Sequence, residues 1–234
     1  MKNMFTEYHE YEDIHPLKAA VLHEELRKKA KEGLRDAEKF NAVSHELLIN
    51  LSKYGWYINE ATSITKFVEF KRLLSLNDAN AINELMVEEV NLNYEALKLT
   101  TIQRFSLNNI ILEKAFTAFE SKQYGYAILI FLTQVDYISK SITGNRFFGR
   151  DNKQAKTKTF AKKYFNEISF YSAVLQPLSD YGEINKAETD FEEGDFNRHK
   201  IIHGEDTNYE TEINAYKIIS LIFYLATLVT KRPD

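Results

Sequence analysis

The sequence contains no cysteine among its 234 residues. Disulfide bonds, thiolate zinc sites and a cysteine nucleophile are therefore excluded together, and this composition suits a reducing cytoplasm. Proline is almost as scarce, with 3 residues, and glycine occurs only 8 times. Because these two residues are the usual interruptions of regular structure, long uninterrupted helices are expected.

Long apolar segments are lacking as well. Met1 is not followed by a basic, apolar and small-residue succession, so no secretory signal is expected. The longest apolar run, residues 218–229, is interrupted by Ser220 and Thr227 and is too short to span a bilayer. We therefore predict that this run forms a buried core helix, and we expect a cytoplasmic protein without a membrane partner.

Charge of one sign does not dominate the chain, because the net charge is -4. A generic polyanion binder would be basic, so this balance argues against one. The charges are nevertheless unevenly distributed. A basic stretch over residues 146–163 contains seven basic side chains and one acidic one, and six acidic residues lie between 183 and 195. Both stretches could be ordinary solvated surface, or the basic one could guide RNA.

Apolar residues recur at three- and four-residue steps along most of the chain. In the segment after Tyr124, for example, Ile128, Phe131, Leu132 and Val135 fall on one helical face. Residues 145–156 are polar and are predicted to be a surface loop. Helices are predicted over about 17–40, 42–54, 63–74, 78–100, 106–120, 124–142 and 188–203, with short ones in 159–174 and a last one ending near 231.

Several residues indicate where these helices begin and end. Gly55, Gly144 and Gly204 are expected to terminate helices, and Ser106 is expected to cap one. The sequence Thr207-Asn208-Tyr209-Glu210 has the pattern of a capping box that opens the last helix. Strand signals are few, so the predicted fold class is all-α, a helical bundle. We place a domain boundary near residue 103, with an N-terminal helical region (1–103) of unknown role packed firmly on a C-terminal helical domain (104–234).

The residues whose side chains are best suited to catalysis lie between Phe196 and Gly204. Arg198, His199 and His203 fall within about two helical turns. The guanidinium of arginine can grip two phosphate oxygens and stays charged, while imidazole exchanges protons near neutral pH. Residues five apart on a helix lie about 140° apart around its axis, whereas residues four apart share a face. His199 and His203 should therefore stack, while Arg198 and His203 should point in different directions.

This spacing resembles the Arg-polar-x-x-x-His motif of HEPN domains, with Arg198 as the arginine, His199 as the polar residue and His203 as the motif histidine. The resemblance covers about residue 104 to the end. It implies a metal-independent endoribonuclease without a cofactor, which dimerises so that two motif helices form one cleft. It further implies a toxin or phage-defence effector, for which an antitoxin or another partner protein is possible. On this reading Arg198 clamps the phosphate, His203 is the acid and base, and His199 assists.

Three further residues are candidates for supporting this site. Asn197 could orient Arg198 or contact RNA, or it could be an ordinary exposed helix residue. Asp136 lies in an apolar run, so it could orient Arg198 or a histidine, form a structural bridge, or face water. Lys200 lies inside the motif and is grouped with these two as a candidate RNA contact or supporting residue.

Two alternatives compete with the ribonuclease hypothesis. The first is a non-catalytic HEPN-like adaptor that binds RNA, a nucleotide or a protein through the same groove. The second is a metal site on His199 and His203, with Glu205 or Asp206 as a third ligand. A zincin helix would carry glutamate at the position of Lys200, so no metal is expected. The other histidines, His9, His15, His23 and His45, are dispersed and are expected at the surface or in helix packing.

Overall fold

The computed structural model describes Lys28 and residues 43–59, 61–63, 65–151, 154–164, 170–179, 183–185 and 196–229. The chain divides into two compact units, Met1–Phe40 and Asn41–Asp234. Apart from Lys28, the helix predicted over residues 17–40 lies outside the described residues. The architecture below is that of the second unit.

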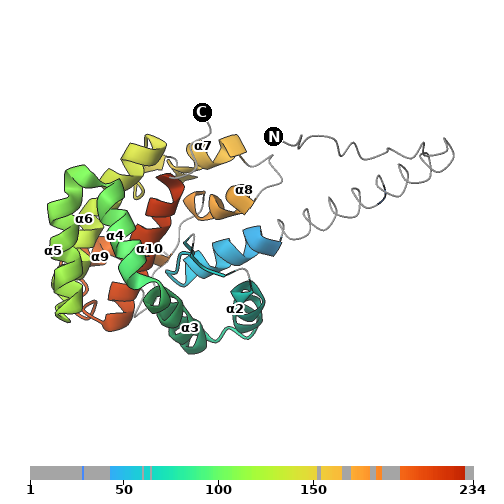
Figure 1. The fold of residues 1–234 in the computed structure, drawn as a ribbon, viewed down its shortest axis with the longest axis horizontal. Coiled ribbons are helices and arrows are strands. Elements are labelled where there is room, and N and C mark those ends of the chain that lie inside the picture. Colours follow the sequence, from blue (N-terminus) through green and yellow to red (C-terminus); the bar gives the residue numbers. More distant parts are fainter. Residues whose placement is uncertain are drawn as a thin grey trace, which may run out of the picture. The chain divides into compact units, whose positions relative to one another are not determined.

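Where the structure describes it, the second unit is built of helices and one small hairpin, which confirms the predicted all-α helical bundle (Figure 1). Residues 43–53 are helical and end at a turn in which Gly55 has a φ of +80°. The helices that follow are α2 (Lys66–Ser75), α3 (Ala79–Leu92), α4 (Tyr94–Arg104), α5 (Asn109–Glu120), α6 (Tyr124–Thr143), α7 (Lys158–Ala161), α8 (Phe170–Val174), α9 (Arg198–Ile202) and α10 (Glu212–Val229).

Helix α10 lies at the centre of the bundle. It packs against α6, α4 and α3, and α5 packs along the other side of α6 (Figure 1). Every side chain from residue 215 to residue 228 is buried, so the apolar run 218–229 forms a core helix as predicted. Burying each large apolar side chain contributes roughly 1.5–3 kcal/mol, so this helix contributes strongly to the stability of the bundle.

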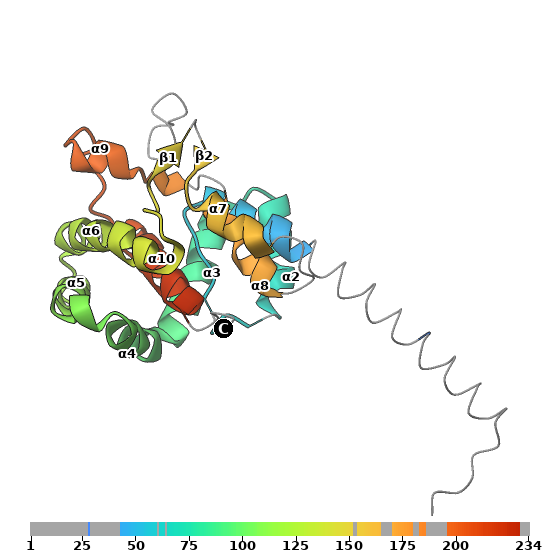
Figure 2. The same cartoon turned by 90° about the horizontal axis from the view of Figure 1, so that it is seen from above.

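Helix α6 also follows its predicted pattern. Ile128, Phe131, Leu132 and Val135 are all buried on one face. The helix ends at Gly144, whose φ of +78° is the left-handed conformation that glycine adopts without a steric penalty. In Figure 2, α9 and the hairpin lie on one side of α6, and α5 and α4 lie on the other.

Two helix boundaries differ from the prediction. The single helix expected over 78–100 is two helices, α3 and α4, separated at Asn93, whose backbone leaves the helical region with φ -123° and ψ 13°. Asp78 caps α3 by accepting a hydrogen bond from the Ala81 N–H at 3.0 Å. The cap expected at Ser106 is also wrong, because residues Ser106–Asn108 form a 3-10 turn before α5 begins.

The start of α10 differs as well, because the predicted capping box at Thr207 is not used. Thr211 caps the helix instead, and its Oγ1 accepts from the Asn214 N–H at 3.1 Å. Tyr124 donates its hydroxyl to Glu212 Oε1 at 2.9 Å and so ties the start of α10 to the start of α6. Burial and the Glu212 carboxylate raise the pKa of Tyr124 to about 12, which keeps the phenol protonated as a donor.

The segment expected to be a plain surface loop, residues 145–156, contains structure. β1 (Arg150–Asp151) and β2 (Gln154–Ala155) pair antiparallel, with Arg150 opposite Ala155. Phe147 and Phe148, immediately before β1, are buried and contact each other edge to face with their ring centroids 5.3 Å apart. These two aromatic side chains anchor an otherwise polar segment to the bundle. The prediction of a surface loop rested on the polarity of the segment and did not take these two side chains into account.

Residues on both sides of the expected boundary near 103 belong to the same compact unit, Asn41–Asp234. Arg104, at the end of α4, donates from Nη1 to the Ala226 carbonyl of α10 at 2.8 Å. The connection between the two expected regions is therefore itself helical and packed against the core. In the part of the chain that the structure describes, no helix is both long enough and apolar enough to cross a membrane.

Candidate functional site

The motif helix α9 is short, and a buried side chain defines its first residue. Asn197 is extended, with φ -119° and ψ 121°, and its Oδ1 accepts a hydrogen bond from the His199 N–H at 2.8 Å. This is the geometry of an N-cap, which satisfies a backbone donor in the first turn. The predicted continuous helix over 188–203 is therefore wrong, because the chain is not helical at 196–197. Asn197 is also fully buried, so it is a structural cap and not an exposed helix residue.

The C-terminal end of α9 is fixed by the backbone of Gly204. Its φ is +73°, and its N–H donates to the Ile201 carbonyl at 3.2 Å. The next N–H, that of Glu205, donates to the Lys200 carbonyl at 2.8 Å. Together these bonds form a Schellman motif, so the cap predicted at Gly204 is confirmed. The Lys200 side chain, a candidate RNA contact, is half-exposed on this helix.

Arg198, the first residue of α9, places its guanidinium over an aromatic ring. Its Cζ atom lies 4.6 Å from the centroid of Phe148, within the range of a cation–π contact. Phe148 itself is only 8% exposed. The Arg198 Nε atom is buried, and no acceptor among the described residues takes its hydrogen bond. The stack thus fixes the plane of the guanidinium, while the residue as a whole remains half-exposed.

Asp136 contributes to this arrangement from helix α6. Its Oδ1 accepts a hydrogen bond from the Phe148 N–H at 3.0 Å. Of the roles considered for Asp136, the geometry shows a structural bridge that holds the backbone of Phe148. Because Phe148 carries the Arg198 guanidinium, the carboxylate acts on Arg198 only through the ring. The sequence offered no indication of Phe148 as a link between the two.

The two imidazoles of α9 meet as their spacing predicts. The ring centroids of His199 and His203 are 4.3 Å apart, with the planes inclined by 55°. His199 is half-exposed and His203 is exposed, so solvent reaches this pair. The site therefore presents two neighbouring imidazoles and one oriented guanidinium from the same five-residue helix and its C-cap.

A buried ion pair fixes the chain immediately before α9. Glu183 accepts from the Phe196 N–H through Oε1 at 3.0 Å and from Lys217 Nζ through Oε2 at 2.6 Å. Both charged side chains are about nine-tenths buried. Gly55 packs directly against them, because a Cβ atom there would lie 2.5 Å from Glu183 Oε2. Glu183 belongs to the acidic stretch over residues 183–195, for which the sequence favours solvated surface, but its side chain is buried. The other acidic residues of that stretch lie outside the described residues.

The metal alternative finds no further ligand in the described ranges. No group of three or more His, Asp or Glu side chains there is arranged to hold a metal ion, including around His199 and His203. His45 lies in helix packing, with Nε2 at 3.5 Å from the Oγ of the buried Ser172. Burial lowers the pKa of His45, which favours the neutral imidazole there. His9, His15 and His23 lie outside the described residues.

Comparison of the chain with protein-family models, with curated proteins and with solved structures found no match in any of the three. The helical fold and the geometry around α9 are therefore what bear on its function.

Proposed function

We propose that the protein is a metal-independent endoribonuclease of HEPN type that works as a homodimer in the cytoplasm, as a toxin or phage-defence effector. The observation that carries this proposal is the pair of solvent-accessible imidazoles, His199 and His203, on the helix that also orients Arg198. This combination supplies the two kinds of group that RNA cleavage needs without a metal: proton exchangers and a fixed positive charge.

Cleavage would start with removal of the 2′-hydroxyl proton by an imidazole, for which His203 is the more exposed candidate. The resulting oxygen attacks the adjacent phosphorus, and Arg198 stabilises the negative charge on the phosphorane. Protonation of the departing 5′-oxygen completes the step, with His199 available to share the proton. The products are a 2′,3′-cyclic phosphate and a 5′-hydroxyl end. The step transfers protons only, so it requires no cofactor.

A second copy of the chain is part of the proposal because α6 and α9 leave apolar side chains in solvent. Tyr126, Leu129 and Tyr137 recur along one outward face of α6, and Tyr126 is 69% exposed. Ile202, next to His203, is 47% exposed. Exposed apolar side chains of this kind are what a two-fold symmetric interface would bury. An interface that includes Ile202 would also bring two copies of α9 together.

The charge distribution supports RNA as the substrate. Over residues 146–163, seven basic side chains against one aspartate leave a formal charge of +6, although the whole chain carries -4. Phe148, the ring under Arg198, belongs to this basic stretch. A local positive field beside the motif would attract the RNA backbone even though the chain as a whole is acidic.

The test is cleavage of RNA by the purified full-length protein in the presence of a chelator. Arg198→Ala and His203→Ala should each lower the cleavage rate by about 100-fold or more. An RNA with a 2′-deoxy sugar at the scissile position should resist cutting, and product ends should be cyclic phosphates. Arg72→Ala, which removes an exposed arginine of α2, serves as the matched control that keeps the wild-type rate.

The outcome also separates the ribonuclease from a binding-only adaptor. An adaptor would bind RNA or a partner without producing new ends, and Arg198→Ala would weaken that binding alone. If the double variant Arg198→Ala/His203→Ala still cleaved RNA at the wild-type rate, these side chains of the motif would not be needed for the reaction. This result would overturn the proposal.

A further inference from the structure

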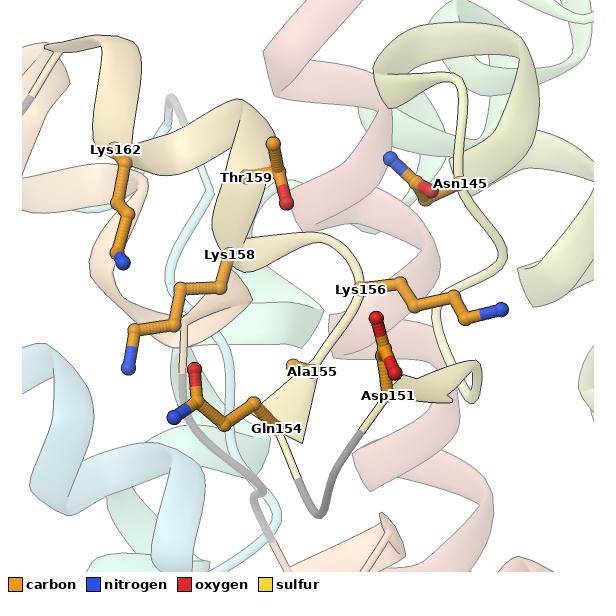
Figure 3. Close-up of a pocket in the computed structure, with 8 residues that line it drawn as sticks. All are labelled: Asn145, Asp151, Gln154, Ala155, Lys156, Lys158, Thr159 and Lys162. Atoms are coloured by element: carbon orange, nitrogen blue, oxygen red, sulfur yellow. The ribbon is translucent and has the colours of Figure 1, made fainter.

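A pocket of about 540 Å³ opens between the β1–β2 hairpin and the helical turns that follow it (Figure 3). Apart from Ala155, its lining residues carry polar groups: lysine ammonium groups, amides, a hydroxyl and one carboxylate. The lining residues are Asn145, Asp151, Gln154, Ala155, Lys156, Lys158, Thr159 and Lys162. None of them belongs to α9, so the pocket is separate from the motif.

The pocket carries an excess of positive charge. Three ammonium groups against the carboxylate of Asp151 leave a formal excess of two positive charges. In the ranges that the structure describes, none of Lys156, Lys158 and Lys162 forms an ion pair. In Figure 3, Lys158 and Lys162 extend to one side of the view, and Lys156 extends to the other. Lys158 and Lys162, which share one side, form a pair of like charges that an anion binding between them would stabilise.

The backbone beneath these lysines is held in place. The Thr157 hydroxyl donates to the Leu178 carbonyl at 2.6 Å in the buried interior. The Lys156 N–H donates to the Gly149 carbonyl at 3.0 Å, which closes the hairpin. Ala161, between the turns that carry Lys158 and Lys162, is fully buried. The backbone that carries the lysines is therefore held in place. This lowers the entropic cost of ordering their side chains around a ligand.

The size and the donors of the pocket indicate the ligand. A volume of this order accommodates a small organic molecule and exceeds what a bare inorganic anion fills. Ammonium groups with the Thr159 hydroxyl and the Gln154 amide offer several donors to one anionic group. A terminal phosphate, with up to two charges and three free oxygens, uses such donors better than an internal phosphodiester with a single charge.

We infer that this pocket binds the terminal phosphate of a nucleotide unit, with the phosphate at Lys158 and Lys162 and the organic part extending toward Asp151 and Asn145. The ligand is either a free nucleotide or the 5′-phosphorylated end of an RNA strand, which share this chemistry. The site does not depend on the proposed cleavage at α9, because none of its lining residues belongs to that helix.

The test measures binding calorimetrically with the full chain carrying Arg198→Ala/His203→Ala, so that no RNA is cut. AMP and ADP are compared with adenosine, and a 5′-phosphorylated octanucleotide with its 5′-hydroxyl form. The phosphorylated member of each bound pair should bind at least about tenfold more tightly, as expected for charge-assisted hydrogen bonds. If only the octanucleotide shows this preference, the source is an RNA end, and if only AMP and ADP show it, the source is a free nucleotide.

The matched comparison uses two double variants with the same change in net charge. Lys158→Gln/Lys162→Gln should lose the preference for the phosphorylated ligand. Lys114→Gln/Lys163→Gln removes two exposed lysines outside the pocket and should keep it. If both double variants lost the preference for the phosphorylated ligand equally, that preference would come from the overall charge of the protein and not from the pocket. This result would overturn the inference. So would equal affinity for phosphorylated and unphosphorylated ligands, or no binding to any of them. Cleavage by the otherwise wild-type chain is scored separately, so failure of one proposal leaves the other standing.

Discussion

Arg198 is held by neighbours that lie far from it in the sequence. Its guanidinium rests on Phe148, and the Phe148 backbone is held by Asp136. A cation–π contact contributes about 0.5–1 kcal/mol at an exposed site and about 2 when it is desolvated. At this half-buried position, the free energy of the contact with the ring is thus large enough to favour one orientation of the guanidinium. An arginine fixed in this way loses less entropy when it grips a phosphate.

Replacing Phe148 with leucine should lower the cleavage rate by roughly threefold to thirtyfold, because the substitution removes the ring under Arg198 but keeps an apolar side chain. Phe147→Leu is the matched control, since Phe147 is equally buried and contacts Phe148 but does not lie under the guanidinium. Rates are measured on RNA, and melting temperatures show that both variants fold. Equal rate losses in the two variants would mean that the stack does not position Arg198.

The local spacing of Arg198, His199 and His203 was enough to predict the imidazole pair, because residues four apart on a helix always become neighbours. The same reading could not find Phe148 or Glu183 as supports. Their contacts with the motif segment depend on how the chain folds back on itself, and no local period records that. The sequence leaves the role of Asn197 open, because an asparagine cap and a surface asparagine look alike in a sequence.

At the scale of elements, a buried charge pair joins the entry of α9 to α10. Glu183 and Lys217 are both removed from water, and the carboxylate also accepts the Phe196 N–H. Desolvating two charges is costly, so such a pair adds little net stability compared with apolar side chains. Losing one partner is far worse, because the other charge is then buried alone. The pair therefore specifies where the motif segment attaches.

Glu183→Gln and Lys217→Met should each lower the free energy of unfolding by about 3–5 kcal/mol, since each leaves one buried charge without its partner. The double variant Glu183→Gln/Lys217→Met should lose less than the sum of the two. Chemical denaturation of all four proteins closes a double-mutant cycle. Losses that simply add would show that the two charges do not interact.

Gly55 and Gly144 offer a test of how tightly this region is packed. Their φ values, +80° and +78°, are nearly the same, but an added Cβ at Gly55 would meet Glu183 Oε2, whereas nothing lies within 4 Å at Gly144. Gly144→Ala should cost roughly 1–2 kcal/mol from the backbone alone. Gly55→Ala should cost more in the same unfolding experiment. Equal costs would contradict the close approach of Gly55 to the ion pair.

Helices α6 and α10 were predictable because long apolar runs with a helical period leave one arrangement that buries them. Boundaries between helices were less predictable. Asn93 interrupts a pattern that continues on both sides, and Thr207 and Thr211 are both plausible caps in sequence. Tertiary contacts determine which threonine caps the helix. The Tyr124 hydroxyl donates a hydrogen bond to Glu212 and so fixes the residue at which α10 starts.

At the scale of the molecule, the proposal requires two chains. Ile202→Glu should halve the mass measured by light scattering, from twice 27.3 kDa to the monomer value, because it places a charge in the proposed interface. RNA cleavage should fall with it, while the melting temperature stays close to that of the wild type. Leu76→Glu, at an exposed apolar residue after α2, is the matched control. A wild-type protein that is active as a monomer would contradict the requirement.

One short segment serves two places on this molecule. Asn145 lines the lysine pocket, and Phe148, three positions on, supports Arg198. A ligand that ordered Asn145 would also restrict the backbone that leads to Phe148, and with it the ring under the motif arginine. Thermodynamic linkage would then make the influence mutual, because occupancy at either place would alter affinity at the other by the same factor. The segment between Asn145 and Phe148 would in that case couple the supply of phosphorylated ligand to the orientation of the arginine.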